Sequence, residues 1–172
     1  MYRDVQTIYT YEHSNLNKTP RQRLEKLWRS SRDGARSPVQ WSAEKNAGFT
    51  TAEEPWIGIN PNYVSINVAQ QEQDPDSVLN FYRRAIKLRK RLSCVRHGSY
   101  QEHFKLSDRL YVYSRQDDKQ KILVICSFSK KKIPVPSPKG FDLGTGKIAL
   151  CNYRKIFPDT LKPYECRVYL WQ

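Results

Sequence analysis

The spacing of the apolar residues changes once along this chain, near Cys94, and that change most limits the possible folds. Residues 77–92 place apolar side chains, from Val78 to Leu92, at helical spacing. After Cys94 the period falls to two in Leu110–Arg115, and the strand candidate 121–128 contains the short continuous apolar run Ile122–Cys126. We therefore predict helical structure before residue 93 and β-structure after it.

The C-terminal part is predicted to be a small antiparallel β domain over residues 93–172. A short turn at 116–120 separates the strand candidates 110–115 and 121–128, which favours a hairpin. Further strand candidates are residues 99–105, 146–152 and 164–171. Three prolines between residues 134 and 138 exclude a central strand there.

The N-terminal part, residues 1–92, offers helices but no strands for them to cover. We expect a short helix within residues 1–13 and a second one from Pro20 to Ser30, capped by Thr19. Residues 31–76 are broken by Gly and Pro yet rich in aromatic side chains, so we expect a long loop without regular structure. Such a loop is usually functional or packed over a larger body.

The composition limits the kinds of binding partner and the cellular compartments that fit this sequence. The net charge is +13, but the basic residues are dispersed and no nucleic-acid-binding motif is present, so we predict no nucleic-acid partner. No apolar run approaches the ~18–20 residues of a membrane span, and the N-terminus lacks a signal-peptide core. The four cysteines follow no zinc or CxxC spacing, which favours reduced, mostly buried thiols in a cytoplasmic protein. We predict no metal and no cofactor.

The segment Ser31–Trp41 contains the residues that are best suited to a functional site. It combines Arg32, Asp33, Arg36 and an indole on a loop shaped by Gly and Pro. Guanidinium groups donate to neighbouring sugar hydroxyls, and an indole offers a flat apolar face to a sugar ring. The residues alone leave a second interpretation open, in which Asp33 pairs internally with Arg32 or Arg36 and Trp41 is a core residue.

Ser31–Trp41 resembles the SRDNARTPMQW signature of oligo-1,6-glucosidases, which are α-glucosidases of the α-amylase superfamily, glycoside hydrolase family 13. The resemblance continues through residues 46–51, 54–57, 60–63 and 76–82 and, less specifically, to the C-terminus. It differs at Gly34, where the family usually has Asn. Trehalose-6-phosphate hydrolases and dextran glucosidases share much of this pattern and remain alternatives.

The resemblance implies an α+β fragment: a C-terminal remnant of a (β/α)8 barrel followed by an antiparallel, β-sandwich-like domain. Residues 1–92 then correspond to the end of the barrel, with the loop at 31–76 and the last barrel helix at 77–92, and residues 93–172 to the β domain. In this family the nucleophilic Asp, the acid/base Glu and a sugar-binding His-Asp pair precede the signature. Only 30 residues precede Ser31, so we expect no catalytic residue and no activity in this chain alone.

The resemblance also implies roles for three residues. Arg36 matches the arginine that contacts hydroxyls of the non-reducing glucose, and Arg32 and Asp33 match neighbours that shape its loop. The parent enzyme would hydrolyse α-1,6-glucosidic bonds of short oligosaccharides, and an exposed barrel-facing surface would favour self-association. Two other functional hypotheses remain open, namely a non-enzymatic carbohydrate-binding β module and a basic nucleic-acid-binding domain.

Overall fold

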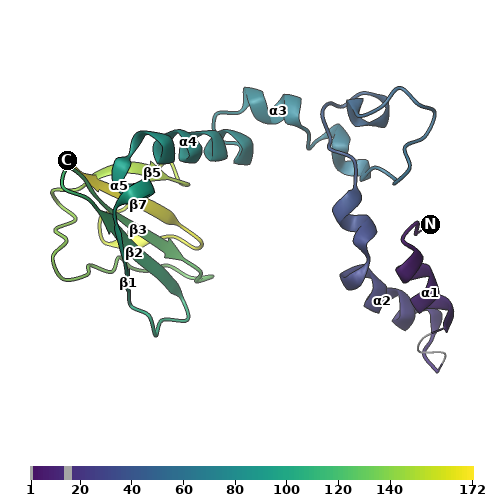
Figure 1. Ribbon diagram of the computed structural model, residues 1–172, viewed down its shortest axis with the longest axis horizontal. Helices are drawn as coiled ribbons and strands as arrows, with labels where there is room; N and C mark the ends of the chain where they lie inside the picture. The colour runs from purple at the N-terminus through teal and green to yellow at the C-terminus, as the bar shows by residue number, and fades with distance from the viewer. Residues whose placement is uncertain (1, 14–16) are drawn as a thin grey trace. The chain divides into compact units, whose positions relative to one another are not determined.

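A computed structural model describes residues 2–13 and 17–172 of the chain. The chain forms two compact units, Met1–Asp74 (unit 1) and Pro75–Gln172 (unit 2), and each is described by itself. Unit 1 holds the helices α1 to α3, and unit 2 holds two further helices and every strand (Figure 1). The boundary predicted at residue 92 separates the end of the parent barrel from the β domain. The division into two compact units does not test that boundary, so it stays a prediction.

Unit 1 begins with two helices whose starts are fixed by side chains. Helix α1 (Val5–His13) follows Asp4, and α2 (Pro20–Ser30) follows Thr19. The Thr19 hydroxyl accepts from the amide of Gln22, whose side chain accepts from the amide of Thr19, which makes a capping box. The predicted start and end of α2 are confirmed.

Residues 31–74 contain more regular structure than the predicted loop. Three 3₁₀ helices lie at Arg32–Arg36 (η1), Lys45–Gly48 (η2) and Pro61–Val64 (η3), followed by α3 (Val68–Gln73). Asn60 caps η3 and Asn67 caps α3 through their side chains. The expectation of a structureless loop was therefore wrong, because these helices are only four to six residues long and too short to show helical periodicity in the sequence.

The strands of unit 2 form one five-stranded sheet and one small ribbon. The sheet has the order β1-β2-β3-β7-β5 and is antiparallel throughout, and β4 pairs with β6 in the ribbon. The strands are β1 (Ser99–His103), β2 (Leu110–Gln116), β3 (Lys121–Ser127), β4 (Ile133–Pro134), β5 (Lys147–Cys151), β6 (Thr160–Leu161) and β7 (Cys166–Trp171). The predicted antiparallel sheet and the β2–β3 hairpin are confirmed. The second layer of the predicted sandwich is only the two-residue strands of the ribbon.

Both faces of the five-stranded sheet are covered. Helix α5 (Ser93–His97) lies over one face together with the C-terminal end of α4 (Val78–Arg91), and there Leu92 and Cys94 join a buried cluster with Ile122, Val124, Val168 and Leu170. On the other face, Leu161 of the ribbon packs with Val112, Leu123, Ile125 and Tyr169. This alternation explains the continuous apolar run in β3, since both faces of that strand are buried.

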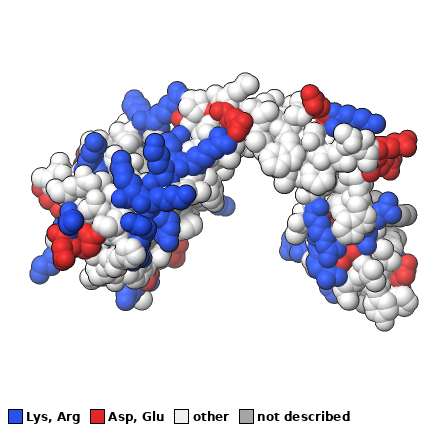
Figure 2. All heavy atoms as spheres, turned by 45° about the horizontal axis from the view of Figure 1, so that its top comes forward, with Lys and Arg blue, Asp and Glu red and all other residues white. Residues whose placement is uncertain are grey.

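The net charge of the chain resides entirely in unit 2. Residues 75–172 carry 21 Lys and Arg against 8 Asp and Glu, whereas residues 1–74 carry nine of each kind. Figure 2 shows Lys and Arg covering much of the visible face of the sheet-bearing unit. In the described part of the chain, no helix has the length and apolar character to cross a bilayer.

Candidate functional site

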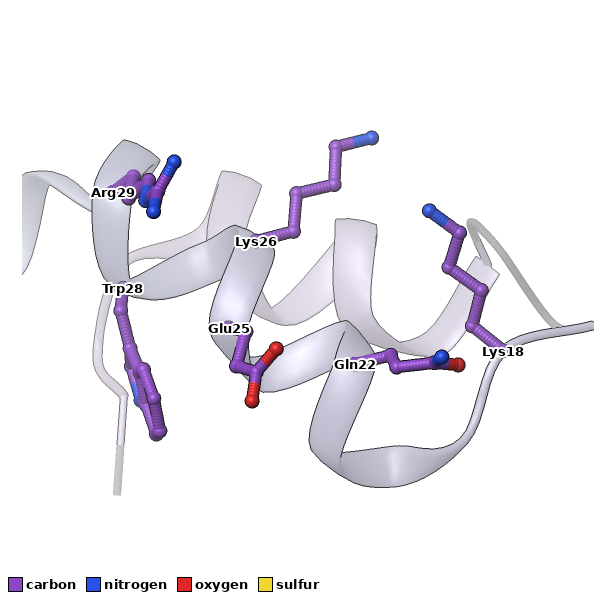
Figure 3. A pocket seen from close by; sticks show the side chains of 6 residues that line it. All are labelled: Lys18, Gln22, Glu25, Lys26, Trp28 and Arg29. Carbon is purple, nitrogen blue, oxygen red and sulfur yellow. The ribbon is translucent and has the colours of Figure 1, made fainter.

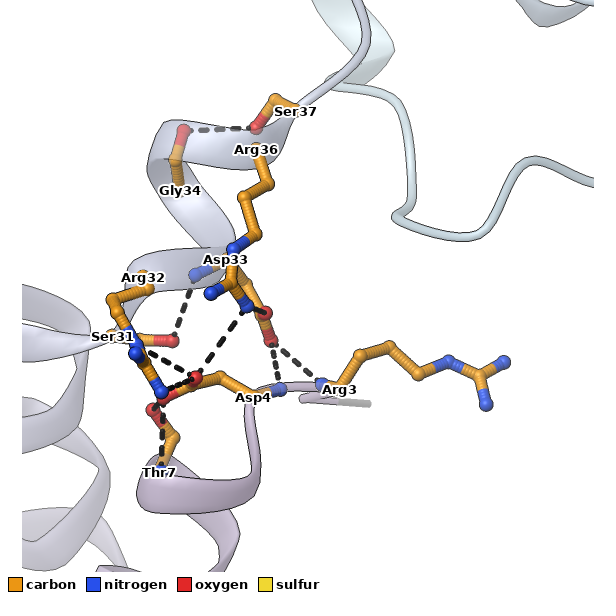
Figure 4. A network of polar contacts seen from close by, with 9 residues as sticks. All are labelled: Arg3, Asp4, Thr7, Ser31, Arg32, Asp33, Gly34, Arg36 and Ser37. Atoms are coloured by element: carbon orange, nitrogen blue, oxygen red, sulfur yellow. Dashed lines mark hydrogen bonds and ion pairs between the residues drawn. The ribbon is translucent and has the colours of Figure 1, made fainter.

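The candidate site is built around η1, inside unit 1. Ser31 ends α2 and caps η1, because its hydroxyl accepts from the amide of Asp33 at 3.3 Å. The short 3₁₀ turn brings Arg32, Asp33 and Arg36 to the same side, facing the start of α1 (Figure 4). The three residues singled out from the sequence are thus brought together.

Asp33 connects η1 to the segment before α1. Its Oδ2 atom accepts from the amides of Arg3, at 2.6 Å, and Asp4, at 3.1 Å. The Arg3 side chain itself points away from this network (Figure 4). Asp33 therefore acts as an internal tie between two segments that are 29 residues apart in the sequence.

Asp4 is the most heavily used acceptor of the site. Its Oδ2 atom accepts from the Thr7 amide at 3.1 Å and the Thr7 hydroxyl at 2.7 Å, which caps α1. Its Oδ1 atom lies 2.6 Å from Arg32 Nη2 and 3.5 Å from Arg36 Nη1. The side-chain hydrogen bond from Thr7, followed by that from Arg32, lowers the pKa of Asp4 against the opposing effect of burial.

Sequence reasoning missed Asp4 completely. The available signal was local: an acidic residue three positions before Thr7, at the start of a helix, matches an N-cap. The contact with Arg32 and Arg36 is not local, since 28 and 32 positions separate these residues from Asp4. No periodicity or spacing rule reports such a contact.

Three side chains lie around the guanidinium group of Arg36, and part of that group remains exposed. Its Nη1 atom lies 3.5 Å from Asp4 Oδ1 and 3.9 Å from Asp33 Oδ1, and its guanidinium carbon lies 5.9 Å from the ring centre of Trp56. Its side chain is 37% exposed. Within the described residues, no hydrogen bond is recorded for Nε or Nη2, so donors remain for a ligand.

The interpretation as an internal ion pair is correct for Asp33 with Arg36, wrong for Asp33 with Arg32, and wrong for Trp41 as a core residue. Arg32 pairs with Asp4, and Asp33 pairs with Arg36, so most of the local charge is compensated within the protein. Trp41 is 51% exposed and is not a core residue. Gln40 donates to Asn62 Oδ1 at 3.1 Å and to the carbonyl of Ile66, which ties the end of the segment to η3.

A hollow adjoins η1. It measures about 480 Å³ and is lined by Tyr2, Leu24, Asp33, Gly34, Ser37, Ile57 and Gly58. The Oδ1 atom of Asp33 is buried and has no hydrogen-bond partner in the described part of the chain. Its nearest recognised partner is Arg36 Nη1 at 3.9 Å, an ion-pair distance that is too long for a hydrogen bond.

The arrangement favours binding over bond cleavage. Asp4 and Asp33 are both buried, and both accept hydrogen bonds that hold η1 against α1. A retaining glycosidase needs two carboxylates ~5–5.5 Å apart, one to attack the sugar and one to exchange a proton. Neither of these two carboxylates is available for such a role. Across the described residues, no group of three or more His, Cys, Asp or Glu is placed to hold a metal ion.

A second hollow lies along α2 and has a different character. It measures about 740 Å³ and is lined by Lys18, Gln22, Glu25, Lys26, Trp28 and Arg29. Figure 3 shows these side chains pointing in different directions, with Lys26 and Trp28 on opposite sides of α2 and Lys18 on the segment before it. Because the side chains diverge, they present no common point for a ligand.

Comparisons with known proteins agree with the resemblance. A family model described as the alpha amylase catalytic domain matches residues 4–98, more than half of the chain. "Probable oligo-1,6-glucosidase 2" of Bacillus subtilis (strain 168) is 38% identical over 98% of this chain and 31% of the relative. The oligo-1,6-glucosidase of Parageobacillus thermoglucosidasius is 34% identical with the same coverage. The chain therefore belongs to the α-amylase family, glycoside hydrolase family 13.

A solved structure extends the similarity to three dimensions. The trehalose-6-phosphate hydrolase TreA of Bacillus licheniformis matches with a TM-score of 0.88 and 34% sequence identity. The match covers 98% of this chain and 32% of that one. The chain thus spans about a third of the length of the relatives that it matches.

Proposed function

We propose that this chain supplies part of the substrate-binding region of a retaining α-glucosidase that hydrolyses α-1,6 bonds in short oligosaccharides. Arg36 would donate hydrogen bonds to hydroxyls of the non-reducing glucose, and Arg32 and Asp33 would hold the loop that presents it. The region 31–76 would belong to the C-terminal face of a (β/α)8 barrel, where such barrels place their active sites. The cytoplasmic location belongs to the same proposal.

One observation carries this proposal, namely the way in which Arg36 is held. Its Nη1 atom contacts two carboxylates, and its exposed side keeps further donors. Two anionic neighbours keep the guanidinium in place without neutralising its remaining donors. Fixing a donor before the sugar arrives reduces the entropy lost on binding.

The test requires the rest of an active site, so we would graft the chain onto a relative. In the Parageobacillus oligo-1,6-glucosidase, the matching 31% is replaced by this chain, and hydrolysis of isomaltose is measured. We expect activity in the chimera and a roughly 10- to 160-fold loss of kcat/KM in its Arg36→Ala variant. That loss corresponds to the ~1.5–3 kcal/mol of a charged hydrogen bond.

Arg21→Ala is the matched control, because Arg21 is an exposed arginine of unit 1 that pairs with Glu25 and with no other acidic residue in the described part of the chain. The control chimera should keep its full activity. Equal activity of the Arg36→Ala and Arg21→Ala chimeras, with circular dichroism confirming their folding, would refute the role of Arg36.

Assays with several substrates test which glycosidic bond the chimera prefers to hydrolyse. The chimera is supplied in parallel with isomaltose, longer dextran fragments and trehalose 6-phosphate. Preference for isomaltose supports the oligo-1,6-glucosidase assignment, whereas preference for one of the others moves it to dextran glucosidase or trehalose-6-phosphate hydrolase.

The isolated chain should not hydrolyse glucosides. We expect no turnover of isomaltose or of an aryl α-glucoside above a protein-free blank. Several large apolar side chains of unit 1 are exposed, among them Trp41, Phe49 and Trp56. We therefore expect concentration-dependent self-association of the isolated chain in sedimentation velocity experiments.

A further inference from the structure

Two cysteines of unit 2 lie directly opposite each other on neighbouring strands. Cys126 of β3 faces Cys166 of β7 in the antiparallel register. The adjacent pair is joined by a backbone hydrogen bond, from the Ser127 amide to the Glu165 carbonyl at 2.8 Å. The two cysteines therefore occupy a non-hydrogen-bonded position, where opposite Cα atoms are about 4.5 Å apart and side chains are closest.

This position suits a covalent link between the two sulfurs. Disulfides span Cα separations of ~4.4–6.8 Å, which includes the separation typical of such a strand pair. The two Sγ atoms already lie 3.2 Å apart. They need to approach by only ~1 Å to reach disulfide length. Both residues are partly exposed, so a small oxidant can reach them.

The two thiols are not equivalent. The hydrogen bond with Cys166 lowers the pKa of Cys126, although burial opposes this effect. The same hydrogen bond, together with burial, raises the pKa of Cys166. The two Sγ atoms lie within hydrogen-bond distance, and the opposite pKa directions favour the thiolate at Cys126 and the thiol at Cys166.

The other two cysteines differ in environment. Cys94 is fully buried among apolar side chains, and this burial raises its pKa. Burial also raises the pKa of Cys151, whose Sγ atom lies 3.5 Å from Glu165 Oε1. All four cysteines are free, and the prediction that most of them are buried was wrong, because only Cys94 is buried and the other three are partly exposed.

We propose that Cys126 and Cys166 form an oxidation site at which hydrogen peroxide converts the two thiols into a reversible intrachain disulfide. The Cys126 thiolate attacks one peroxide oxygen, the O–O bond breaks, and the departing hydroxide takes a proton to leave as water. Cys166 then attacks the resulting sulfenic sulfur, the S–S bond forms, and the S–O bond breaks to release a second water. The two sulfurs lose two electrons in total, and peroxide gains them.

The link would join β3, the central strand of the sheet, to β7 at the last residue pair of their ladder. Positions 126 and 166 are 40 residues apart, so the bridge closes a long loop of the unfolded chain. Oxidation should therefore raise the Tm of the chain, and reduction with dithiothreitol should restore the original Tm.

Peptide mapping of the full, reduced chain tests the proposal directly. The protein is treated with hydrogen peroxide at neutral pH, alkylated with N-ethylmaleimide and digested with trypsin. Each of the four cysteines lies in a different tryptic peptide. We expect the number of free thiols to fall from four to two and the peptides of Cys126 and Cys166 to be linked to each other.

Two variants distinguish this site from general oxidation. Cys166→Ser should stop at a sulfenic acid on Cys126, which dimedone labels, whereas Cys151→Ser should form the disulfide as the native chain does. A link through Cys94 or Cys151, links only between two molecules, or four alkylatable thiols after peroxide treatment would each overturn the proposal. Peptide mapping of the native chain still tests the proposal if one of the variants fails to fold.

Discussion

At the scale of single residues, Asp4 couples the stability of unit 1 to pH. Its pKa is lowered in the folded protein, so the folded state favours the charged carboxylate more than the unfolded state does. The resulting stabilisation is complete above the unfolded pKa of ~3.9 and is lost as the pH falls through the lower, folded value.

The corresponding experiment compares the native chain with Asp4→Asn across that acidic range. We expect the variant to unfold more readily at neutral pH and the difference to shrink progressively as the solution is acidified below about pH 4. This difference in stability is measured from the denaturant concentration at the midpoint of unfolding, followed by circular dichroism at each pH. Glu53→Gln, at an exposed carboxylate of the same unit, should leave the pH dependence unchanged.

Glu165 and Arg167 make the second prediction at this scale. Both side chains are completely buried, and Arg167 Nε donates to Glu165 Oε1 at 2.6 Å. Burial alone would raise the pKa of Glu165, but hydrogen bonds from Arg167 and the Lys162 amide outweigh it and lower that pKa.

Arg167→Met should lower the free energy of unfolding by about 3–5 kcal/mol, because it leaves a buried carboxylate without its partner. The double variant Glu165→Leu, Arg167→Met should lose much less, since no charge then remains buried. Urea denaturation measures both. A double variant as unstable as the single one would show that packing, and not the charge, explains the effect.

At the scale of elements, most of the secondary structure could be predicted because its signals are local. The cap at Thr19 fixed the start of α2, and the alternation in β2 and the apolar run in β3 identified the hairpin. Strand ends were less accurate. β7 begins at Cys166, two residues later than predicted, because Tyr164 adopts a positive φ of 56° that ends extended pairing.

The elements that were missed depend on contacts that a sequence does not reveal. The ribbon strands β4 and β6 have two residues each and exist because Ile133 and Leu161 pair across a long connection. Of the site, Arg32, Asp33 and Arg36 were identified through a family signature. Asp4, which pairs with Arg32 and Arg36, could be identified only from the three-dimensional structure.

The capping box of α2 gives a prediction at this scale. Thr19→Ala removes the hydroxyl that accepts from the Gln22 amide, and it should cost about 0.5–2 kcal/mol. Hydrogen exchange of the first amides of α2 should accelerate accordingly. Thr19→Ser, which keeps the hydroxyl, is the control and should exchange at nearly the native rate.

At the scale of the whole molecule, the two units should separate under limited proteolysis. Helix α4 packs with α5 and β5 in unit 2, so the protected fragment should begin near Pro75. A fragment beginning near residue 93 would instead agree with the boundary predicted from the family. N-terminal sequencing and mass spectrometry of the resistant fragment decide between them.

The uneven distribution of charge gives the two proteolytic products opposite behaviour in an electric field. The piece from unit 1 carries equal numbers of acidic and basic side chains and should barely migrate near neutral pH. The piece from unit 2, with thirteen more basic than acidic side chains, should run rapidly toward the cathode. Native electrophoresis alone would therefore separate the two halves of the chain.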